Sequence, residues 1–309
     1  MADPHVTPPS SPSPSLRQAE DFPREVLRLF DRYVHGDISR RDFLAGAARH
    51  ATVGVSALAF LEALSPRFAR AQQVAPDDSR IRAEHVEFES PRGHGKGRGY
   101  LVRPAAASGK RPGVLVVHEN RGLNPHIEDI ARRLALADFV AFAPDALFPL
   151  GGYPGDEDKA RALFGQLEQP KAHEDFVAAA AMLRSHAAVT GRIGVVGFCY
   201  GGGIANLLAT RLPELRAAVP FYGRAPAAAD VPDIRAEMQI HYASNDERTN
   251  AGWPAYEAAL KAARVRYEAF FYPNTEHAFN NDTTPRYNAE AAKLAWQRTI
   301  DLFNRTLRG

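Results

Sequence analysis

Three nearly uninterrupted apolar runs constrain the fold of this chain more than any other feature of its sequence. They are V-L-V-V at 114–117, V-A-F-A at 140–143 and I-G-V-V at 193–196. Runs without alternating polar residues are typical of parallel strands that are covered on both faces. Helical patterns separate the runs, and this alternation predicts an α/β fold with a mostly parallel central sheet and helices on both faces.

The region from residue 80 to the C-terminus fits this interpretation throughout. Strands are expected at 85–89, 99–102, 113–117, 139–142, 193–196, 217–221, 238–242 and 267–272, and helices near 125–137, 156–168, 173–185, 202–211, 253–264 and 289–307. The first two strands flank S-P-R-G-H-G-K-G-R-G, whose glycines and proline favour a hairpin loop. In such a sheet the ligand site lies beyond the carboxyl ends of the strands, so the residues after each strand are the functional candidates.

The single cysteine of the chain follows one of these strands. Cys199 lies in G-F-C-Y-G, which fits the pattern of a nucleophile on a sharp strand-to-helix turn. Gly197 and Gly201 provide the small neighbours that such a turn needs. A helix that starts after Cys199 would lower the pKa of the thiol and would offer the backbone N–H of Tyr200 to an oxyanion. The alternative is a packed thiol, because a free cysteine behaves as a small buried hydrophobe.

Two further strand ends carry the partners that a nucleophile needs. Asp246 lies in A-S-N-D-E-R after one strand, and His277 lies in P-N-T-E-H-A-F after the next. The order nucleophile, acid, histidine is that of the α/β-hydrolase arrangement, in which the acid orients the imidazole that accepts the nucleophile's proton. His241 is the other histidine after Cys199, and it is expected in the core because it falls inside an apolar strand.

The loop after the 113–117 strand contains H-E-N-R-G-L. In this arrangement the loop supplies the second oxyanion N–H, which we assign to Asn120, and it brings Glu119 towards the site. A solvated surface charge is the alternative for Glu119. No metal and no cofactor is expected, because the zinc pattern H-E-x-x-H fails at position 122 and one cysteine excludes a cysteine-based zinc site.

The first 71 residues differ from the rest. Residues 1–16 are rich in proline and serine and are expected to be disordered, whereas residues 22–35 have apolar side chains at helical spacing. The catalytic domain is expected at 72–309.

An export signal is the first interpretation of the residues between these two parts. The segment contains S-R-R-D-F-L at 39–44, an apolar run at 51–61 and A-R-A at 69–71. Together they predict a twin-arginine signal, which engages the twin-arginine export machinery and places the protein in the periplasm. The apolar run of 11 residues is too short for a membrane span, which takes about 20. The alternative is a helical extension that is retained on the main domain of a cytoplasmic protein.

Taken together, the strand-end segments resemble the dienelactone hydrolase (carboxymethylenebutenolidase) family of the α/β-hydrolase fold. The resemblance covers about residues 80–309 and rests on V-V-H-E-N-R-G-L, F-A-P-D, V-G-F-C-Y-G-G-G, Y-A-S-N-D and E-H-A-F. It implies that Cys199 is the nucleophile, Asp246 the acid and His277 the base. It also implies that Glu119 holds the resting thiol neutral and takes its proton when substrate binds.

The resemblance implies hydrolysis of an enol-lactone through a thioester. Cys199 would attack the ring carbonyl, the N–H groups of Asn120 and Tyr200 would hold the oxyanion, and water activated by His277 would cleave the thioester. The chain departs from the family at the arginines that grip the substrate carboxylate: no basic residue follows F-A-P-D before position 159, and the first arginine after the histidine is at position 286. Arg121 or Arg224 could replace them, because a carboxylate favours a bidentate guanidinium; the alternative is that both are surface charges.

Other functions compete with lactone hydrolysis. A broad carboxylesterase or thioesterase would use the same triad on other activated acyl compounds, and a non-catalytic or thiol-sensing protein would keep Cys199 as a packed or oxidisable thiol. A nucleotide-binding domain is disfavoured because V-V-G-F-C-Y-G lacks the dinucleotide glycine spacing. The near balance of 38 basic and 36 acidic residues gives no indication of nucleic-acid binding, so the expected partner is a small-molecule lactone or ester.

Overall fold

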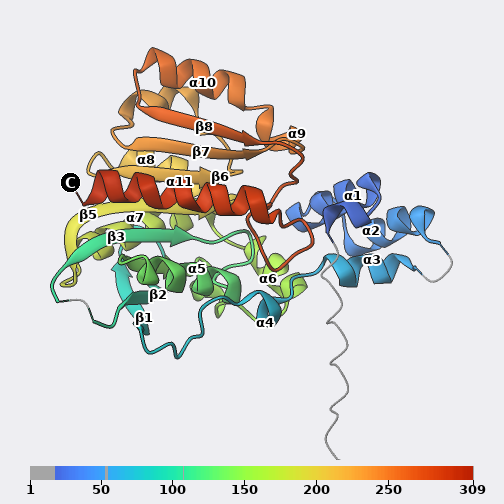
Figure 1. The fold of residues 1–309 in the computed structure, drawn as a ribbon, viewed down its shortest axis with the longest axis horizontal. Coiled ribbons are helices and arrows are strands. Elements are labelled where there is room, and N and C mark those ends of the chain that lie inside the picture. The colour runs from blue at the N-terminus through green and yellow to red at the C-terminus, as the bar shows by residue number, and fades with distance from the viewer. Residues whose placement is uncertain (1–17, 53–54, 107, 309) are drawn as a thin grey trace, which may run out of the picture.

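The computed structural model describes residues 18–52, 55–106 and 108–308. Its centre is an eight-stranded sheet with the order β1-β2-β4-β3-β5-β6-β7-β8 (Figure 1). The strands are β1 (Ile81–Ser90), β2 (Gly95–Pro104), β3 (Arg111–Val117), β4 (Val140–Pro144), β5 (Val189–Phe198), β6 (Ala217–Phe221), β7 (Glu237–Ala243) and β8 (Tyr267–Tyr272). β2 pairs antiparallel with β1 and β4, and every other neighbouring pair is parallel. The predicted mostly parallel sheet with a leading hairpin is therefore confirmed.

Helices cover both faces of the sheet, as the apolar runs predicted. On one face lie α5 (Pro125–Leu136) and α11 (Ala289–Leu307); on the other lie α7 (Gln169–Ser185), α8 (Tyr200–Arg211) and α10 (Trp253–Ala262). In β3, Val114 and Val116 belong to the core under α5 and α11, whereas Leu115 and Val117 belong to the opposite core. Because successive side chains of a strand point to opposite faces, two covered faces require an unbroken apolar run.

The observed helices differ from the predicted ones mainly at their ends. The helix expected over 156–168 is the shorter α6 (Glu157–Phe164), and α7 begins at Gln169, four residues earlier than expected. A proline in the first turn favours this earlier start, because its missing N–H costs no helical hydrogen bond there. The short helix α9 (Glu247–Asn250) and the 3₁₀ turns at Phe148–Leu150 and Ala228–Asp233 were not predicted.

The described residues before position 72 form a small helical unit, by which we mean residues 18–52 and 55–71. Its helices are α1 (Arg24–His35), α2 (Arg40–Ala47), α3 (Ala57–Leu64) and α4 (Phe68–Ala71). They enclose an apolar cluster of their own, which includes Val26, Phe30, Phe43 and Leu64. Figure 1 shows the unit beyond the arrowheads of the parallel strands, at the edge where the sequence places the site.

Local sequence explains where the first two helices begin and end. α1 has apolar side chains on one face and ends at Gly36, whose φ of 85° is typical of a helix C-terminus. α2 begins within S-R-R-D: the Ser39 hydroxyl accepts from the Asp42 N–H at 3.1 Å, and the Asp42 carboxylate accepts from the Ser39 N–H at 3.0 Å. The segment that contains the arginine pair is therefore also a reciprocal helix cap.

Two predictions for the N-terminal region reach beyond the described residues. The expected disorder of residues 1–16 lies outside them, and the apolar run at 51–61 lacks positions 53 and 54. Among the described helices, none combines the length and the apolar character that crossing a bilayer requires. The export signal stays a prediction.

Candidate active site

Cys199 occupies the turn between β5 and α8. It is the N-cap of α8 and has a φ of 55°, a backbone conformation that non-glycine residues rarely adopt. A Cβ atom on Gly197 would lie 1.9 Å from the Gly201 carbonyl oxygen, and one on Gly201 would lie 2.2 Å from the Val117 oxygen. The two glycines are therefore required by the turn, as expected for a nucleophile held above the end of a sheet. The Cys199 thiol is partly exposed and forms no disulfide.

Asp246 and His277 meet beside this turn. The Nδ1 of His277 lies 2.5 Å from the Asp246 carboxylate, and both side chains are buried. Because a carboxylate accepts, Nδ1 carries the hydrogen and Nε2 is left for other chemistry; this buried Nε2 has no hydrogen-bond partner among the described residues. Burial opposes ionisation of both groups, but their mutual attraction lowers the pKa of Asp246, and the negative charges of Cys199 and Asp246 raise the pKa of His277 to about 10.

His241 is a core residue, as predicted. Its Nδ1 lies 2.8 Å from the Tyr272 hydroxyl, and its Nε2 lies 3.3 Å from the Gln239 amide oxygen. Burial, with the charge of Arg298 as a second cause, lowers its pKa to about 3. His241 is therefore neutral at physiological pH and lies inside the core at β7. The histidine that faces Cys199 from the end of β8 is His277.

The hydrogen-bond partner of the Cys199 thiol is a residue that the sequence analysis did not single out. His35, the last residue of α1, places its Nε2 3.4 Å from the Cys199 Sγ. Its Nδ1 lies 2.7 Å from the Asp31 carbonyl oxygen and 3.3 Å from the Asp31 carboxylate. The His35 ring also meets the His277 ring edge-on, with 4.8 Å between centroids.

These two histidines change the acidity of the thiol. Burial raises the pKa of Cys199, but the positive charges on His277 and His35 outweigh burial and lower it to about 6. In turn, burial lowers the pKa of His35, whereas the thiolate charge and the hydrogen bond to Asp31 outweigh burial and raise it to about 9. The resting site therefore favours a thiolate beside imidazolium.

The loop after β3 brings Glu119, Asn120 and Arg121 to the same place. The carboxylate of Glu119 accepts from the Asn281 amide at 2.9 Å, and both line the cavity in front of Cys199. Buried His118 anchors the loop, because its Nε2 accepts from the Ala146 N–H at 3.1 Å. Glu119 thus lies in the cavity, where the sequence placed it, but its carboxylate binds Asn281, and the thiol binds His35.

Asn120 and Arg121 bind the helical unit through their side chains. The Asn120 amide donates to the Val34 carbonyl at 2.8 Å, and the Arg121 guanidinium donates to the same oxygen at 3.1 Å. The Asn120 backbone is thereby held at the rim of the cavity that Cys199 also lines. Tyr200 is the first residue of α8, so its backbone N–H has no acceptor within the helix.

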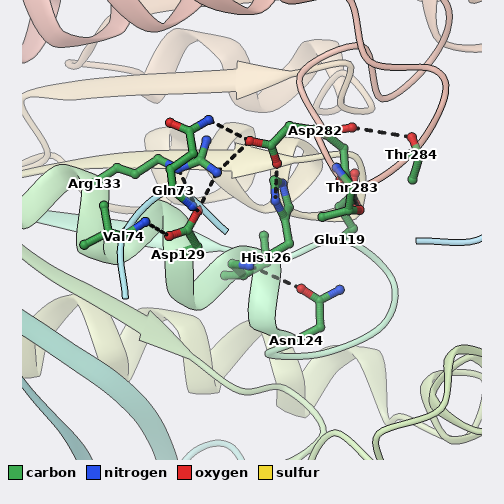
Figure 2. Close-up of polar contacts among 12 residues, drawn as sticks. Gln73, Val74, Glu119, Asn124, His126, Asp129, Arg133, Asp282, Thr283 and Thr284 are labelled. Carbon is green, nitrogen blue, oxygen red and sulfur yellow. Dashed lines mark hydrogen bonds and ion pairs between the residues drawn. The ribbon is translucent and has the colours of Figure 1, made fainter. Parts of the chain in front are cut away.

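The loop after His277 is fixed by a buried charge network. Figure 2 shows the carboxylate of Asp282 between Gln73, His126 and Arg133, and Arg133 also binds Asp129. The Arg133 guanidinium lies 2.6 Å from Asp282, and the Gln73 amide donates at 2.8 Å. This network ties the loop that carries Asn281 to α5, and so indirectly positions the Glu119 carboxylate.

A cavity of about 400 Å³ opens in front of the thiol, between the helical unit and the sheet. Its walls include Phe30, Tyr33 and Leu61 from the helical unit. Three arginines line it, Arg40, Arg121 and Arg286. Arg224 lies elsewhere: it is exposed, and it lines a second hollow that also reaches Cys199.

The charges around the thiol oppose a metal ion, although three donor atoms lie close together there. The donor atoms of His35, Cys199 and His277 lie within 4.8 Å of one another. However, the Arg248 guanidinium lies 2.8 Å from the His35 Nε2, and a positive charge so close opposes a second cation.

Sequence reasoning missed His35 and Arg286. His35 directly precedes the helix-ending Gly36, and no local pattern indicates that this helix end lies on a thiol 164 positions away. Arg286 is too far from His277 in sequence to match the family's spacing, yet it is buried and lines the cavity.

Comparisons with known proteins identify the family of the sheet-containing part of the chain. The model of the "Dienelactone hydrolase family" matches residues 98–307, and a second model, "YqhI-like", matches residues 14–51. The chain is 34% identical over 218 residues to a Yersinia pestis protein named "Putative carboxymethylenebutenolidase", which covers 66% of this chain and 82% of that protein. It is 55% identical over 114 residues to the Escherichia coli K12 protein named "Putative hydrolase fragment YghX", over 37% of this chain and 97% of that one. A crystal structure titled as a putative dienelactone hydrolase from Klebsiella pneumoniae superposes with a TM-score of 0.63 at 30% identity, covering 72% of this chain and 99% of the other.

Proposed function

Because the chain belongs to the dienelactone hydrolase family and is an ester or lactone hydrolase, we propose that it opens an enol-lactone ring with Cys199 as the nucleophile. One observation carries this proposal: the thiol lies on a strained turn, beside the buried His277–Asp246 pair. A thiol with a pKa lowered to about 6 is largely thiolate at neutral pH, and the thiolate is the nucleophilic form.

The proposed reaction has two steps. In the first, the Cys199 sulfur bonds to the lactone carbonyl carbon, the oxyanion is held by the N–H groups of Tyr200 and Asn120, and the ring C–O bond breaks. The departing enolate takes the proton that the thiol gave up. In the second, neutral His277 removes a proton from water as the water oxygen attacks the thioester, and the thiolate leaves.

Asp246 acts through His277 in both steps. Its carboxylate holds the Nδ1–H at 2.5 Å and keeps Nε2 directed at the reacting atoms. It also stabilises the imidazolium that forms when water is deprotonated.

We also propose that Arg286 binds an anionic group of the substrate. It lines the cavity in front of Cys199, and its Nε and one Nη form no hydrogen bond among the described residues. Asp31 lies 3.6 Å from it and partly neutralises it. Arg121 is less suited, because the Asn120 side chain and the Val34 carbonyl already engage it, and exposed Arg224 lies on a different hollow.

A broad carboxylesterase or thioesterase on the same triad is the second candidate. It is favoured by the acidic residues of the cavity wall, Glu119, Asp156, Glu157 and Asp158, which would repel an anionic substrate. A panel of cis- and trans-dienelactones, uncharged lactones and aryl esters separates the two. A preference for carboxylated lactones that Arg286→Gln removes supports the first, and equal turnover of uncharged esters supports the second.

Cys199→Ala tests the mechanism itself. Loss of the nucleophile is expected to abolish hydrolysis, with a rate reduced by about 10³-fold or more. Thermal unfolding should change little, because the thiol is partly exposed and crosslinks nothing. Retained turnover in this variant would remove Cys199 from the mechanism.

Export by the twin-arginine route is a proposal separate from catalysis, supported by S-R-R-D-F-L and the apolar segment after it. Cleavage after Ala71 would remove His35 from the thiol and the helical wall from the cavity, so the contacts favour the alternative of a retained extension. The N-terminal residue of protein recovered from periplasmic and cytoplasmic fractions decides between them. A periplasmic form that begins near Gln72 supports export with cleavage, and an intact N-terminus in the cytoplasm contradicts it.

A further inference from the structure

The thiol of this hydrolase contacts a second histidine, which comes from outside the sheet. We propose that His35 is a catalytic residue that shares the proton of Cys199, and that the docked helical unit forms one wall of the active site. The inference rests on the proposed function of Cys199 as the nucleophile and extends it to a residue that neither the sequence pattern nor the relatives assign.

The geometry around the sulfur contains two histidine–aspartate pairs. The Nδ1 of His277 binds the Asp246 carboxylate at 2.5 Å, whereas the Nδ1 of His35 binds the Asp31 backbone carbonyl at 2.7 Å and lies 3.3 Å from the Asp31 carboxylate; each imidazole turns its Nε2 towards the sulfur. Asp31 and His35 lie four positions apart on α1 and therefore on the same helix face. The His35 Nε2 lies 3.4 Å from the Cys199 Sγ, and both imidazoles lower the pKa of the thiol.

The end of α1 is fixed on the catalytic domain by several hydrogen bonds. Its last carbonyl groups point at cations: Arg161 donates to the Tyr33 oxygen at 2.6 Å, and Arg121 donates to the Val34 oxygen at 3.1 Å. The C-terminal end of a helix carries partial negative charge, so guanidinium groups stabilise it there. Elsewhere in the unit, the Arg67 N–H donates to the Thr283 carbonyl at 2.8 Å. His35 is thus placed by a docked helix end.

Charged and titratable groups face His35 and Cys199 from every neighbouring element. They are Asp31 of α1, Glu119 and Arg121 after β3, Tyr222 after β6, Arg248 of α9, and His277 and Arg286 after β8. Arg248 competes directly for His35, because its guanidinium lies 2.8 Å from Nε2 and can donate only to the neutral ring. Its side chain is about half exposed, so it can move into solvent when the ring is protonated and Nε2–H donates to the thiolate.

Two imidazoles allow the two proton transfers to be separated. In the resting site the thiolate lies beside two protonated imidazoles, and His35 holds the proton that the thiol gave up. During acylation the S–C bond forms, the ring C–O bond breaks and the enolate oxygen takes the proton of His35; His277, no longer beside a thiolate, passes its own proton to His35. During deacylation the neutral His277 takes a proton from water, the acid product and the thiolate separate, and both imidazoles are again protonated as in the starting state.

The decisive experiment measures the alkylation of Cys199 by iodoacetamide as a function of pH. The chain contains one cysteine, so the reaction reports this thiol alone. In His35→Ala the apparent thiol pKa should rise by roughly one unit, and alkylation at pH 6 should slow by up to about tenfold. His35→Gln retains a hydrogen-bonding group without a basic nitrogen, so it should also raise the apparent pKa of the thiol. His50→Ala, which removes a histidine of the same unit that does not line the cavity, should match the unchanged protein.

Steady-state turnover and unfolding temperature complete the test. His35→Ala should lower kcat, free imidazole should partly restore it, and the unfolding temperature should stay near that of His50→Ala. An unchanged alkylation profile in both His35 variants would overturn the proposal, and so would faster hydrolysis in His35→Ala, because His35 would then only obstruct the thiol. A shifted profile in a protein that hydrolyses none of the lactones or esters would support proton sharing and overturn the proposed function instead.

Discussion

The two histidine–aspartate pairs beside Cys199 contain the same residue types, but different parts of the structure hold them in place. His277 and Asp246 follow neighbouring strands, β8 and β7, whose pairing fixes both loops. His35 and Asp31 belong to a helix whose position depends on hydrogen bonds and ion pairs across an interface. The first pair is therefore built into the sheet, whereas the second is present only while the helical unit is docked. The position of His277 is therefore fixed by the sheet, whereas His35 leaves the thiol when the helical unit undocks.

Replacing the two aspartates separately is the test with the largest expected effect. Asp246→Asn should lower kcat by about 10³- to 10⁴-fold, because the amide no longer selects the required tautomer of the catalytic imidazole. Asp31→Asn should lower it by only about tenfold, since it alters the basicity of His35 and leaves the first pair intact. Single-turnover and steady-state rates on one activated ester measure both. Equal losses would show that the two pairs form one unit.

The pH dependence of kcat/KM tests the roles of the thiol and of His35. The thiol pKa is lowered to about 6, so the thiolate is lost as pH falls through that value; the pKa of His35 is raised to about 9, so its imidazolium is lost as pH rises through that value. A plateau is therefore expected between about pH 6 and 9, with a tenfold decrease per unit on the acid side. Activity that stays constant down to pH 5 would contradict the assigned thiol.

Arg40→Ala should have the smallest effect. Its guanidinium lies 3.0 Å from the Asp158 carboxylate, but both side chains are 39% exposed or more, and such pairs contribute about 1 kcal/mol or less. The unfolding temperature should therefore change by a few degrees at most, which thermal denaturation can measure. A large decrease in unfolding temperature would show that docking of the helical unit depends on this one ion pair. The His35–Asp31 pair would then be lost more easily than its other contacts indicate.

The fold was predictable because its determinants are periodic and local. The runs V-L-V-V, V-A-F-A and I-G-V-V form strands that face two cores. The glycines around Cys199 indicate a turn that leaves no room for a Cβ atom at positions 197 and 201. Asp246 and His277 could be placed together because the carboxyl ends of parallel strands share one edge. The helix boundaries were less accurate, because they depend on capping and on the first turn.

His35 could not be found in this way. Its distance from the thiol is set by how one folded unit sits on another, and hydrophobic periodicity contains no information about that placement. Arg286 was missed for a related reason, since its loop is positioned by the ion pairs of Asp282 with His126 and Arg133 of α5 and not by its spacing from His277.

Sequence patterns were sufficient to predict the sheet, the turn that presents Cys199, and the two strand ends that supply Asp246 and His277, because these depend on side-chain period, turn geometry and chain order. The packing of the helical unit on the sheet sets which partner the thiol has at rest, where the helical unit lies, and which arginines face the cavity. Those features depend on contacts between residues far apart in the chain, such as the Val34 carbonyl with Asn120 and Arg121, and such contacts exist only once both units have folded.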